Sequence, residues 1–480
     1  MSPLSVVIPY VFLLAAGDTP AESPLDAAAA PEEAARETPI ENGAELPRSD
    51  VAGSSPRLDQ PPPGPLPVLE DAAPTPASAS ASASPSRLDP GVDLDSIRFR
   101  AGKGLAFQSR DGHQALELRL RVQFQSDTAW LPSEAPDAAE EERALENTFG
   151  IRRARLQFAG HVFGKHNRYK AEFAFSPRDL GVRDGVPHQT PLLDWYAEFT
   201  HLRDLSLRLG QYKLLYSRQR VISSGDLAFV DRSLVQSEFN LDRDIGLHLY
   251  SSDLLGFDRF RYYAGVSIGE GRDVWAAQPM LSTDAGGLQY LVRVEALPLG
   301  GAKEKWDYSE VDFDRSDAPR LALGFAYAFL DDGQRVRGYQ GSPFADDGRV
   351  DYHNVNADLL LKWAGVTAFG ELYWREGRRQ PGTSGEVSEP ARNGIGYGLQ
   401  LDALVPSVPV NVGARYSTAQ PGTYDATSTA LGTSQEAGLT IGWFPAEHAL
   451  KLQADVFHLW SDELFVDAED RVRVLMQVAY

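Results

Sequence analysis

The stretch Phe149–Val162, FGIRRARLQFAGHV, carries apolar or small side chains at every second position from Ala154. The positions between them include two arginines, a glutamine and a histidine, namely Arg153, Arg155, Gln157 and His161. Because side chains in a strand alternate with a period of two, the segment predicts a half-buried strand with cations on its wet face. In a water-soluble sandwich the wet face is the outside. In an outer-membrane barrel lipid covers the outside, and the polar face lines a water-filled interior.

The composition excludes several classes of protein. The chain has 480 residues and no cysteine, which excludes a disulfide framework, thiolate metal sites and cysteine nucleophiles. Mean hydropathy is mildly negative, and the sequence has no run of 18 apolar residues, so a helical membrane protein is excluded. A transmembrane barrel remains, because its alternating pattern hides apolar residues from averages.

The amino-terminal fifth of the chain differs from the rest. Residues 1–17 contain the apolar run LSVVIPYVFLLAA followed by small residues, which predicts a secretory signal; an ordinary buried segment is the alternative. Residues 18–95 are rich in Ala, Pro, Ser and Glu and carry a net charge of −11, so we expect a disordered periplasmic linker. Residues 96–262 have a net charge of +2 and residues 263–480 one of −12.

Alternation predicts sixteen strands in residues 96–480, and therefore an all-β, antiparallel transmembrane barrel behind a disordered N-terminal segment. Their expected bounds are 114–127, 148–163, 168–176, 191–201, 204–212, 244–252, 259–268, 288–297, 320–329, 353–363, 366–375, 394–404, 410–418, 434–444, 448–458 and 470–480. Sixteen strands enclose a lumen too wide for side chains to fill, so we expect an aqueous channel.

The connections between these strands alternate between long and short, as in outer-membrane barrels with short periplasmic turns and long extracellular loops. One connection breaks the rule: Pro298–Pro319 is long but falls on the short-turn side. It indicates either a periplasmic excursion or a miscounted strand. The last strand places Tyr480 in phase with four apolar residues, which favours closure against the first strand with an aromatic at the membrane interface.

Basic residues dominate the face that this phasing turns inward. Arginine presents a planar fork of donors that suits oxyanions, and rings of Arg or Lys make anion pores. The longest loop, about 213–243, is long enough to fold into the barrel and narrow it, and it adds further cations, Arg232 and Arg243 among them. The candidate anion path consists of Arg119, Arg121, Arg152, Arg153, Arg155, Lys170, Arg208, Lys213, Arg218 and Arg220. The alternative is that these cations pair with neighbouring carboxylates in a general porin for small polar solutes.

Five stretches resemble the phosphate-selective porin O and P family of outer-membrane channels over about residues 100–480. They are RRARLQFAGHV at 152–162, LRLGQYKLLYS at 207–217, SSGDLAFVDRSLV at 223–235, RDIGLHLYS at 243–251 and VRVLMQVAY at 472–480. The resemblance implies a homotrimer of sixteen-stranded barrels in the outer membrane of a Gram-negative bacterium. It also implies that inward arginines and lysines guide phosphate or another small anion to a narrow site formed with the third loop.

Carried over by position, the resemblance implicates Arg121, the pair Arg152 and Arg153, Lys170, and Lys213 at the end of the GQYK motif. The sequence differs from the family pattern in two respects. Leu215 replaces a proline that often follows that motif, and the loop carries arginines where phosphate-specific members use lysine. These differences bear on the specificity for phosphate rather than on the channel.

The sequence contains little that indicates an enzyme or a metal-binding protein. HxxxH and HExxH spacings are absent, so no metal site is expected; we expect no enzyme either, although an outer-membrane hydrolase remains a minor alternative. The pairs Asp331–Asp332 and Asp346–Asp347 lack the spacing of a calcium loop and indicate solvated surface. We therefore predict an outer-membrane, anion-preferring diffusion channel that contacts membrane lipid and needs neither a cofactor nor a nucleic acid.

Overall fold

A computed structural model gives the structure of the chain. It describes residues 97–480 apart from residues 101, 132–143, 184–185, 188, 273–286, 339, 383–384, 386, 388, 423–428 and 462–467. The predicted signal (1–17) and linker (18–95) lie outside the described residues. The chain divides into two units; all described residues belong to the first, and the second, residues 26–88, is outside the described part.

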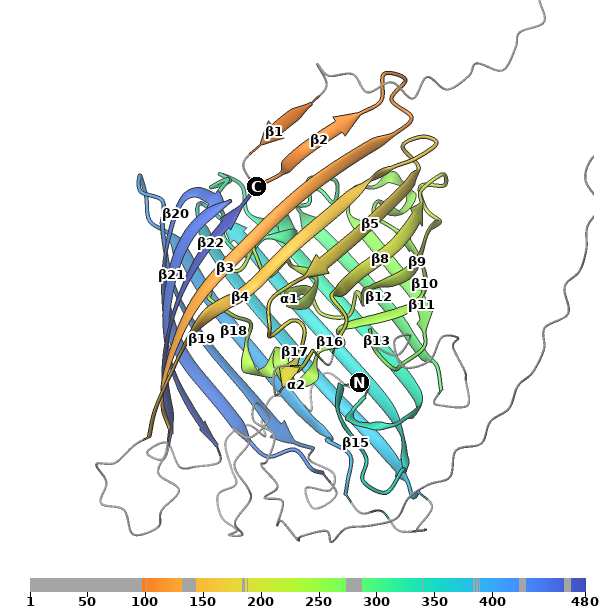
Figure 1. Cartoon of the computed structure of the whole chain (residues 1–480), viewed down its shortest axis with the longest axis vertical. Coiled ribbons are helices and arrows are strands. Elements are labelled where there is room, and N and C mark those ends of the chain that lie inside the picture. The colour runs from red at the N-terminus through yellow and green to blue at the C-terminus, as the bar shows by residue number, and fades with distance from the viewer. Residues whose placement is uncertain are drawn as a thin grey trace, which may run out of the picture. The chain divides into compact units, whose positions relative to one another are not determined.

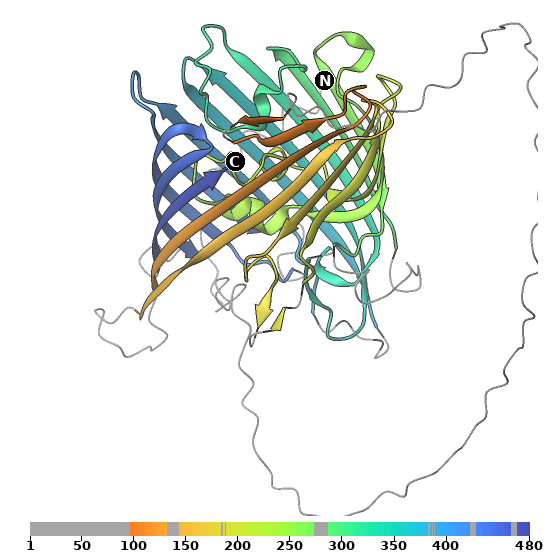
Figure 2. The same ribbon diagram turned by 45° about the horizontal axis from the view of Figure 1, so that its top comes forward.

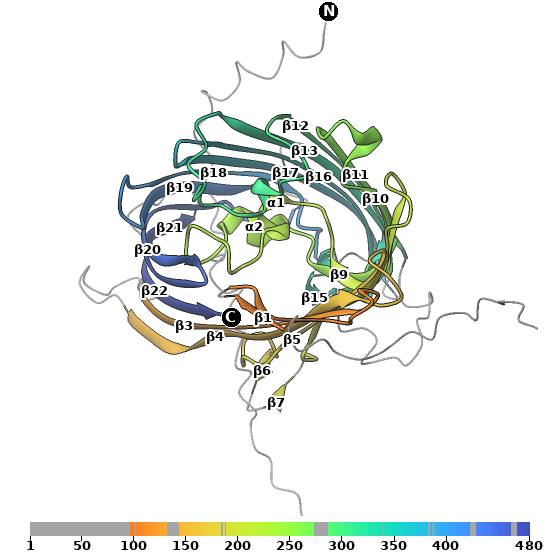
Figure 3. The same ribbon diagram turned by 90° about the horizontal axis from the view of Figure 1, so that it is seen from above.

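Sixteen antiparallel strands form a closed barrel, because each pairs with the next along the chain and β22 pairs back onto β3. Figure 1 shows this barrel from the side and Figure 3 along its axis. The predicted sixteen-stranded barrel is confirmed. Its strands are β3 (Ala115–Leu131), β4 (Ala144–His161), β5 (Asn167–Ala174), β8 (Leu192–Phe199), β9 (Ser206–Lys213), β10 (Arg243–Ser251), β11 (Phe260–Ser267), β12 (Gln289–Leu299), β13 (Arg320–Gly333), β16 (Arg349–Trp363), β17 (Val366–Gln380), β18 (Gly394–Leu404), β19 (Val410–Pro421), β20 (Ser434–His448), β21 (Leu450–Ser461) and β22 (Glu469–Ala479).

The burial pattern along the strands is the inverse of that in a water-soluble β-protein. On β12, Arg293 and Glu295 are 1% and 7% exposed, whereas their apolar neighbours Val292 and Val294 are 51% and 50% exposed. An apolar outer face and a polar inner face are what a barrel surrounded by lipid requires. No helix in the described part of the chain is long and apolar enough to cross a membrane.

The two ends of the barrel differ in their connections, as the sequence predicts, and we call them the turn side and the loop side. One short connection on the turn side is Ala364-Gly365, between the paired residues Trp363 and Val366. Both turn residues have positive φ, 53° and 91°, which is the geometry of a two-residue type I′ hairpin. The φ of 91° at Gly365 is a conformation that residues with a side chain rarely adopt, which favours glycine there.

The long connection on the turn side is present in the structure, and no strand was miscounted, but the connection folds into the barrel. Residues 300–319, which we call the insert, link β12 to β13 and include the 3₁₀ turn η6 (Trp306–Tyr308). Trp306 packs inside the barrel against apolar wall residues that include Leu297, Leu360 and Phe369. The insert therefore occupies the lumen rather than the space outside the barrel.

A hairpin before the first predicted strand extends the wall on the turn side. Its strands are β1 (Arg98–Arg100) and β2 (Gly104–Gln108), and β2 pairs with the start of β3. Strands of three and five residues are too short to show alternation in the sequence, which is why they were not predicted. Figure 2 shows the hairpin at the turn-side end. The remaining short strands lie in loop-side connections: β6 (Val182–Arg183), β7 (Val186–Pro187), β14 (Arg335–Arg337) and β15 (Gln340–Pro343).

Candidate functional site: the channel interior

The longest connection, residues 214–242, folds into the barrel, and we call it the inner loop. It contains α1 (Arg218–Val221) and α2 (Leu234–Phe239), whose first turns are capped by the hydroxyls of Ser217 and Ser233. α2 packs against β17–β20, and Figure 3 shows both helices within the ring of strands. The inner loop is thus held against one side of the barrel.

Buried ion pairs attach the inner loop to that side. Arg218 of α1 lies 2.6 Å from both Asp307 of the insert and Asp358 of β16, and 3.4 Å from Glu295 of β12. Two wall arginines complete the cluster: Arg261 pairs with Asp307 and Glu295, and Arg293 with Glu295 and Asp358. Three arginines and three carboxylates therefore balance one another almost out of contact with water.

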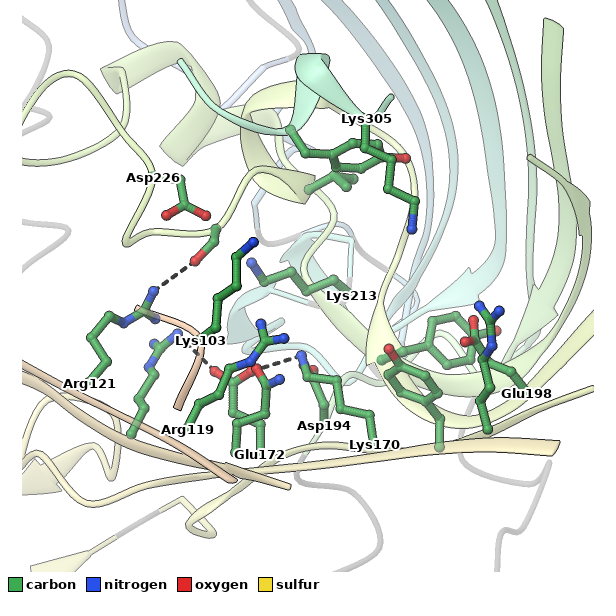
Figure 4. A pocket seen from close by; sticks show the side chains of 18 of the residues that line it. Lys103, Arg119, Arg121, Lys170, Glu172, Asp194, Glu198, Lys213, Asp226 and Lys305 are labelled. Atoms are coloured by element: carbon green, nitrogen blue, oxygen red, sulfur yellow. Dashed lines mark hydrogen bonds and ion pairs between the residues drawn. The ribbon is translucent and has the colours of Figure 1, made fainter. Parts of the chain in front are cut away.

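The other side of the barrel encloses open space. On the turn side a chamber of about 1010 Å³ lies between the inner loop and the wall from β3 to β11, and we call it the turn-side chamber (Figure 4). Among the described residues its lining includes ten arginines and lysines but five carboxylates. The basic residues are Lys103, Arg119, Arg121, Arg155, Arg168, Lys170, Arg203, Arg208, Lys213 and Lys305.

Carboxylates neutralise some of these cations but not others. Lys170 lies 2.7 Å from Asp194 and 2.9 Å from Glu172, and Arg208 lies 2.5 Å from Glu198. Lys103, Lys213 and Lys305 form no ion pair with any described residue, and Figure 4 shows all three extending into the chamber. No described carboxylate therefore neutralises the charge of these three lysines.

A second chamber, of about 230 Å³, lies toward the loop side, and we call it the loop-side chamber. Nine of its described lining residues are arginine or lysine and two are acidic, Asp179 and Asp242. The basic residues are Arg152, Arg153, Arg155, Arg178, Lys213, Arg220, Arg232, Arg243 and Arg272. This excess of fixed positive charge attracts anions and repels cations.

Arg155 and Lys213 line both chambers, so they lie between the two chambers. Arg155 is paired with Asp179 at 2.9 Å. Lys213 instead donates from Nζ to the backbone oxygen of Arg220 at 3.2 Å, which leaves its charge uncompensated. Beside them, Arg121 donates to the hydroxyls of Ser223 and Ser224 on the inner loop, at 2.7 and 3.2 Å.

The double-arginine motif of β4 holds the tip of the inner loop. Arg152 pairs with Asp231, and Arg153 donates to the same carboxylate at 3.2 Å and to Gln123 at 2.9 Å. Burial raises the pKa of Asp231, but attraction to Arg152 and Arg153 outweighs it and holds the pKa well below the usual value. The two arginines thus position the loop as well as lining the loop-side chamber.

The structure brings nine of the ten predicted path residues to the two chambers. Arg218 is the exception: it lines neither chamber, because its charge is used in the buried cluster. Six further basic residues line the chambers without having been predicted: Lys103, Arg168, Arg178, Arg203, Arg272 and Lys305. Lys103 lies ahead of the first predicted strand, and Arg178, Arg203, Arg272 and Lys305 lie in connections, where alternation gives no signal for the direction of a side chain. Arg168 begins the strand predicted at 168–176 and has the same parity as Lys170, so alternation could have placed it on the inner face.

The described residues offer little for a metal ion. Asp331, Asp332 and Asp351 come within 4.8 Å of one another at the loop-side ends of β13 and β16. Nothing else at that cluster points to a bound ion, and exposed carboxylates are common at such rims.

Comparisons with known proteins agree with this architecture. The family described as "Phosphate-selective porin O and P" matches residues 119–272, which include β3–β11 and the inner loop. Curated proteins offer no sequence match. Among solved structures, the outer membrane channel DcaP of Acinetobacter baumannii is 9% identical, with a TM-score of 0.45, over 79% of this chain and 100% of that one. OmpF of Salmonella typhi is 12% identical, with a TM-score of 0.47, over 77% and 98%. With TM-scores below 0.5, these two similarities carry no argument.

Proposed function

We propose that the chain is an outer-membrane porin that conducts small anions and prefers phosphate or a similar oxyanion, because it folds as a sixteen-stranded barrel and its residues 119–272 match the phosphate-selective porin O and P family. The turn side then faces the periplasm and the loop side the exterior. The observation that carries the proposal is the loop-side chamber, with its nine basic and two acidic residues, which shares Arg155 and Lys213 with the turn-side chamber.

The path has an entrance, a middle and an exit. The field of the arginines concentrates anions in the loop-side chamber. Between the two chambers the ammonium group of Lys213, which no described carboxylate neutralises, supplies hydrogen bonds that replace part of the hydration shell of the anion. Lys103 and Lys305 then offer further donors toward the periplasm. Transport requires that none of these contacts binds too tightly for release.

The assembly is proposed as a homotrimer, on the family resemblance. Heat-modifiable migration in detergent gels and native mass spectrometry test it: the unheated protein should run at three times the mass of one chain. A monomer that conducts with the same selectivity would overturn the trimer and leave the channel standing.

The test of selectivity is a planar-bilayer recording of the purified protein. We expect a reversal potential in a salt gradient that indicates anion preference, and a chloride current that millimolar phosphate blocks. Because hydrogen bonds to charged groups contribute about 1.5–3 kcal/mol, Lys213→Gln should weaken the phosphate block roughly tenfold or more. Lys165→Gln, on an exposed turn outside both chambers, is the matched control and should leave the block unchanged.

A second candidate function, a general porin for small polar solutes, is favoured by the carboxylates of the turn-side chamber. Glu172, Asp194 and Glu198 each pair with a cation there and lower its net charge. Large currents with weak selectivity and no response to phosphate would support that function and overturn the oxyanion preference.

A further inference from the structure

We propose that the insert holds the inner loop in place from the periplasmic side through the hydrogen bonds of Glu310, an attachment that we call the latch. We propose also that the insert places Lys305 beside the path of the anion. Residues 300–319 lie outside the segment that matches the family, so nothing in that match assigns them a role. The latch stands on geometry alone, whereas the part played by Lys305 rests on the proposed function.

The insert is itself fixed to the barrel wall. Lys362 of β16 donates from Nζ to the backbone oxygens of Trp306 and Val311, at 3.1 and 3.0 Å. Asp312 accepts the backbone N–H of Gly365 from the tight turn at 2.8 Å. Trp306 is buried among apolar wall side chains. These contacts make the insert a rigid support rather than a free loop.

Glu310 connects this support to the middle of the inner loop. Its carboxylate is fully buried and accepts the backbone N–H of Ala228 at 2.8 Å and the side-chain amide of Gln219 at 3.1 Å. Its own N–H donates to the backbone oxygen of Asp226 at 3.0 Å. The side-chain amide of Gln400 on β18 donates to the carboxylate at 3.2 Å. One side chain therefore joins the insert, the inner loop and the wall.

Apolar contacts lie beside this carboxylate. Ala228 and Phe229 of the inner loop pack in one cluster with Val311 of the insert and with wall residues such as Phe444 and Phe457. The loop segment held here directly follows Ser223 and Ser224, which bind Arg121 on the opposite wall. The inner loop is thus fixed at both margins of the passage, and Glu310 is a positioning residue for it.

Lys305 reaches the path from the same element. It has a left-handed backbone (φ 53°) directly before η6, and it lines the turn-side chamber together with Tyr308. Figure 4 shows its side chain extending from the insert toward the space that Lys213 also enters. The insert therefore supplies both a support for the inner loop and one free cation.

The first experiment compares single-channel currents of Glu310→Ala and Glu310→Gln with those of Glu304→Gln. Glu304 is an exposed carboxylate on the same insert, whose ion pair with Arg320 spans 3.5 Å. Loss of the latch should let the inner loop move into the passage, so we expect several-fold more open-channel noise and brief closures in both Glu310 variants. A steady current from folded Glu310 variants, equal to that of Glu304→Gln, would overturn the latch.

The second experiment does not depend on how the Glu310 variants fold. Because the chain has no cysteine, Lys305→Cys gives a single thiol that charged methanethiosulfonates modify. A sulfonate-bearing reagent should reduce the anion current, and a trimethylammonium reagent should restore it toward that of the unsubstituted protein. Lys303→Cys, exposed two residues away and outside the chambers, is the control and should be labelled without effect on current.

The outcomes separate the latch from the proposed function. Labelling of Lys305→Cys, verified by mass, without a change in current would remove Lys305 from the path. A channel with no anion preference that still becomes noisy in the Glu310 variants would overturn the anion function and keep the latch.

Discussion

The wall from β3 to β11 and the wall from β12 to β22 both turn charged side chains inward, but into different surroundings. In the first wall most of them face the two chambers, where Lys213 and Arg121 meet no carboxylate within ion-pair distance among the described residues. Arg261 of β11 is an exception, because it belongs to the buried cluster. In the second, the inner loop and the insert cover the charges, and Arg293 pairs with Glu295 and Asp358 almost without water. The same residue types therefore line open chambers on one side of the barrel and attach the inner loop and the insert on the other.

We call the wall from β3 to β11 the open wall and the wall from β12 to β22, which the inner loop and the insert cover, the covered wall. Loss of one cation should lower the free energy of unfolding much more at the covered wall than at the open wall. Arg218→Met would leave three buried carboxylates facing two arginines, Arg261 and Arg293. Breaking a buried pair by removing one partner costs roughly 3–5 kcal/mol, so unfolding in urea should occur at a markedly lower concentration.

Two variants serve as controls for that measurement. Arg121→Gln, in the open wall, removes hydrogen bonds to two hydroxyls only and should change the free energy of unfolding by about 1 kcal/mol. Arg218→Met combined with Asp358→Asn restores the charge balance and should recover part of the loss. If Arg218→Met were as stable as Arg121→Gln, the contrast between the two walls would fail.

The next largest effect is expected when acid weakens the ion pairs between the inner loop and the covered wall. Glu238 of α2 pairs with Arg375 and Arg392. Burial raises the pKa of Glu238, but these arginines outweigh it and lower the pKa from 4.5 to about 2. A lowered pKa stabilises the folded protein above pH 4.5, and this contribution, about 3 kcal/mol, is lost as the pH falls from 4.5 toward 2.

Urea unfolding at pH 6 and pH 3 measures this loss. Glu238→Gln should be less stable than the unsubstituted protein at pH 6, and it should show a smaller decrease on acidification. Equal decreases in the two proteins would mean that Glu238 is not the group that titrates.

These contrasts also show what sequence reasoning can reach. Alternation places Arg119, Arg121 and Arg155 on the inner face, because the direction of a strand side chain follows from its parity. It cannot tell Arg218 from Arg220, since both lie in a loop whose path through the lumen depends on contacts with distant strands. The long connection on the turn side is visible in the sequence, but its position inside the barrel rests on Lys362 and Asp312, whose partners come from other segments.

A smaller effect is expected at Asp231 of the inner loop, which neutralises Arg152 and Arg153 of β4 at the loop-side chamber. Asp231→Asn keeps the shape and removes the negative charge. One added net positive charge, screened by water and salt, should raise the anion-to-cation permeability ratio about two- to fivefold. The reversal potential in a salt gradient measures this ratio. Because the pKa of Asp231 is held well below its usual value, that residue should not change the ratio between pH 7 and pH 4.

The smallest effect is expected from Arg119→Gln, because Arg119 is a cation of the open wall that a carboxylate already neutralises. Arg119 is a basic residue of the turn-side chamber, but it pairs with Glu117 at 2.5 Å and both side chains are more than two-fifths exposed. Exposed pairs contribute about 0–1 kcal/mol, and water screens their charges. The variant should therefore match the unsubstituted protein in urea unfolding, and its phosphate block should shift by less than about twofold, against roughly tenfold for Lys213→Gln. A loss of block as large as that of Lys213→Gln would mean that every cation on the open wall contributes alike, whether or not a carboxylate compensates it.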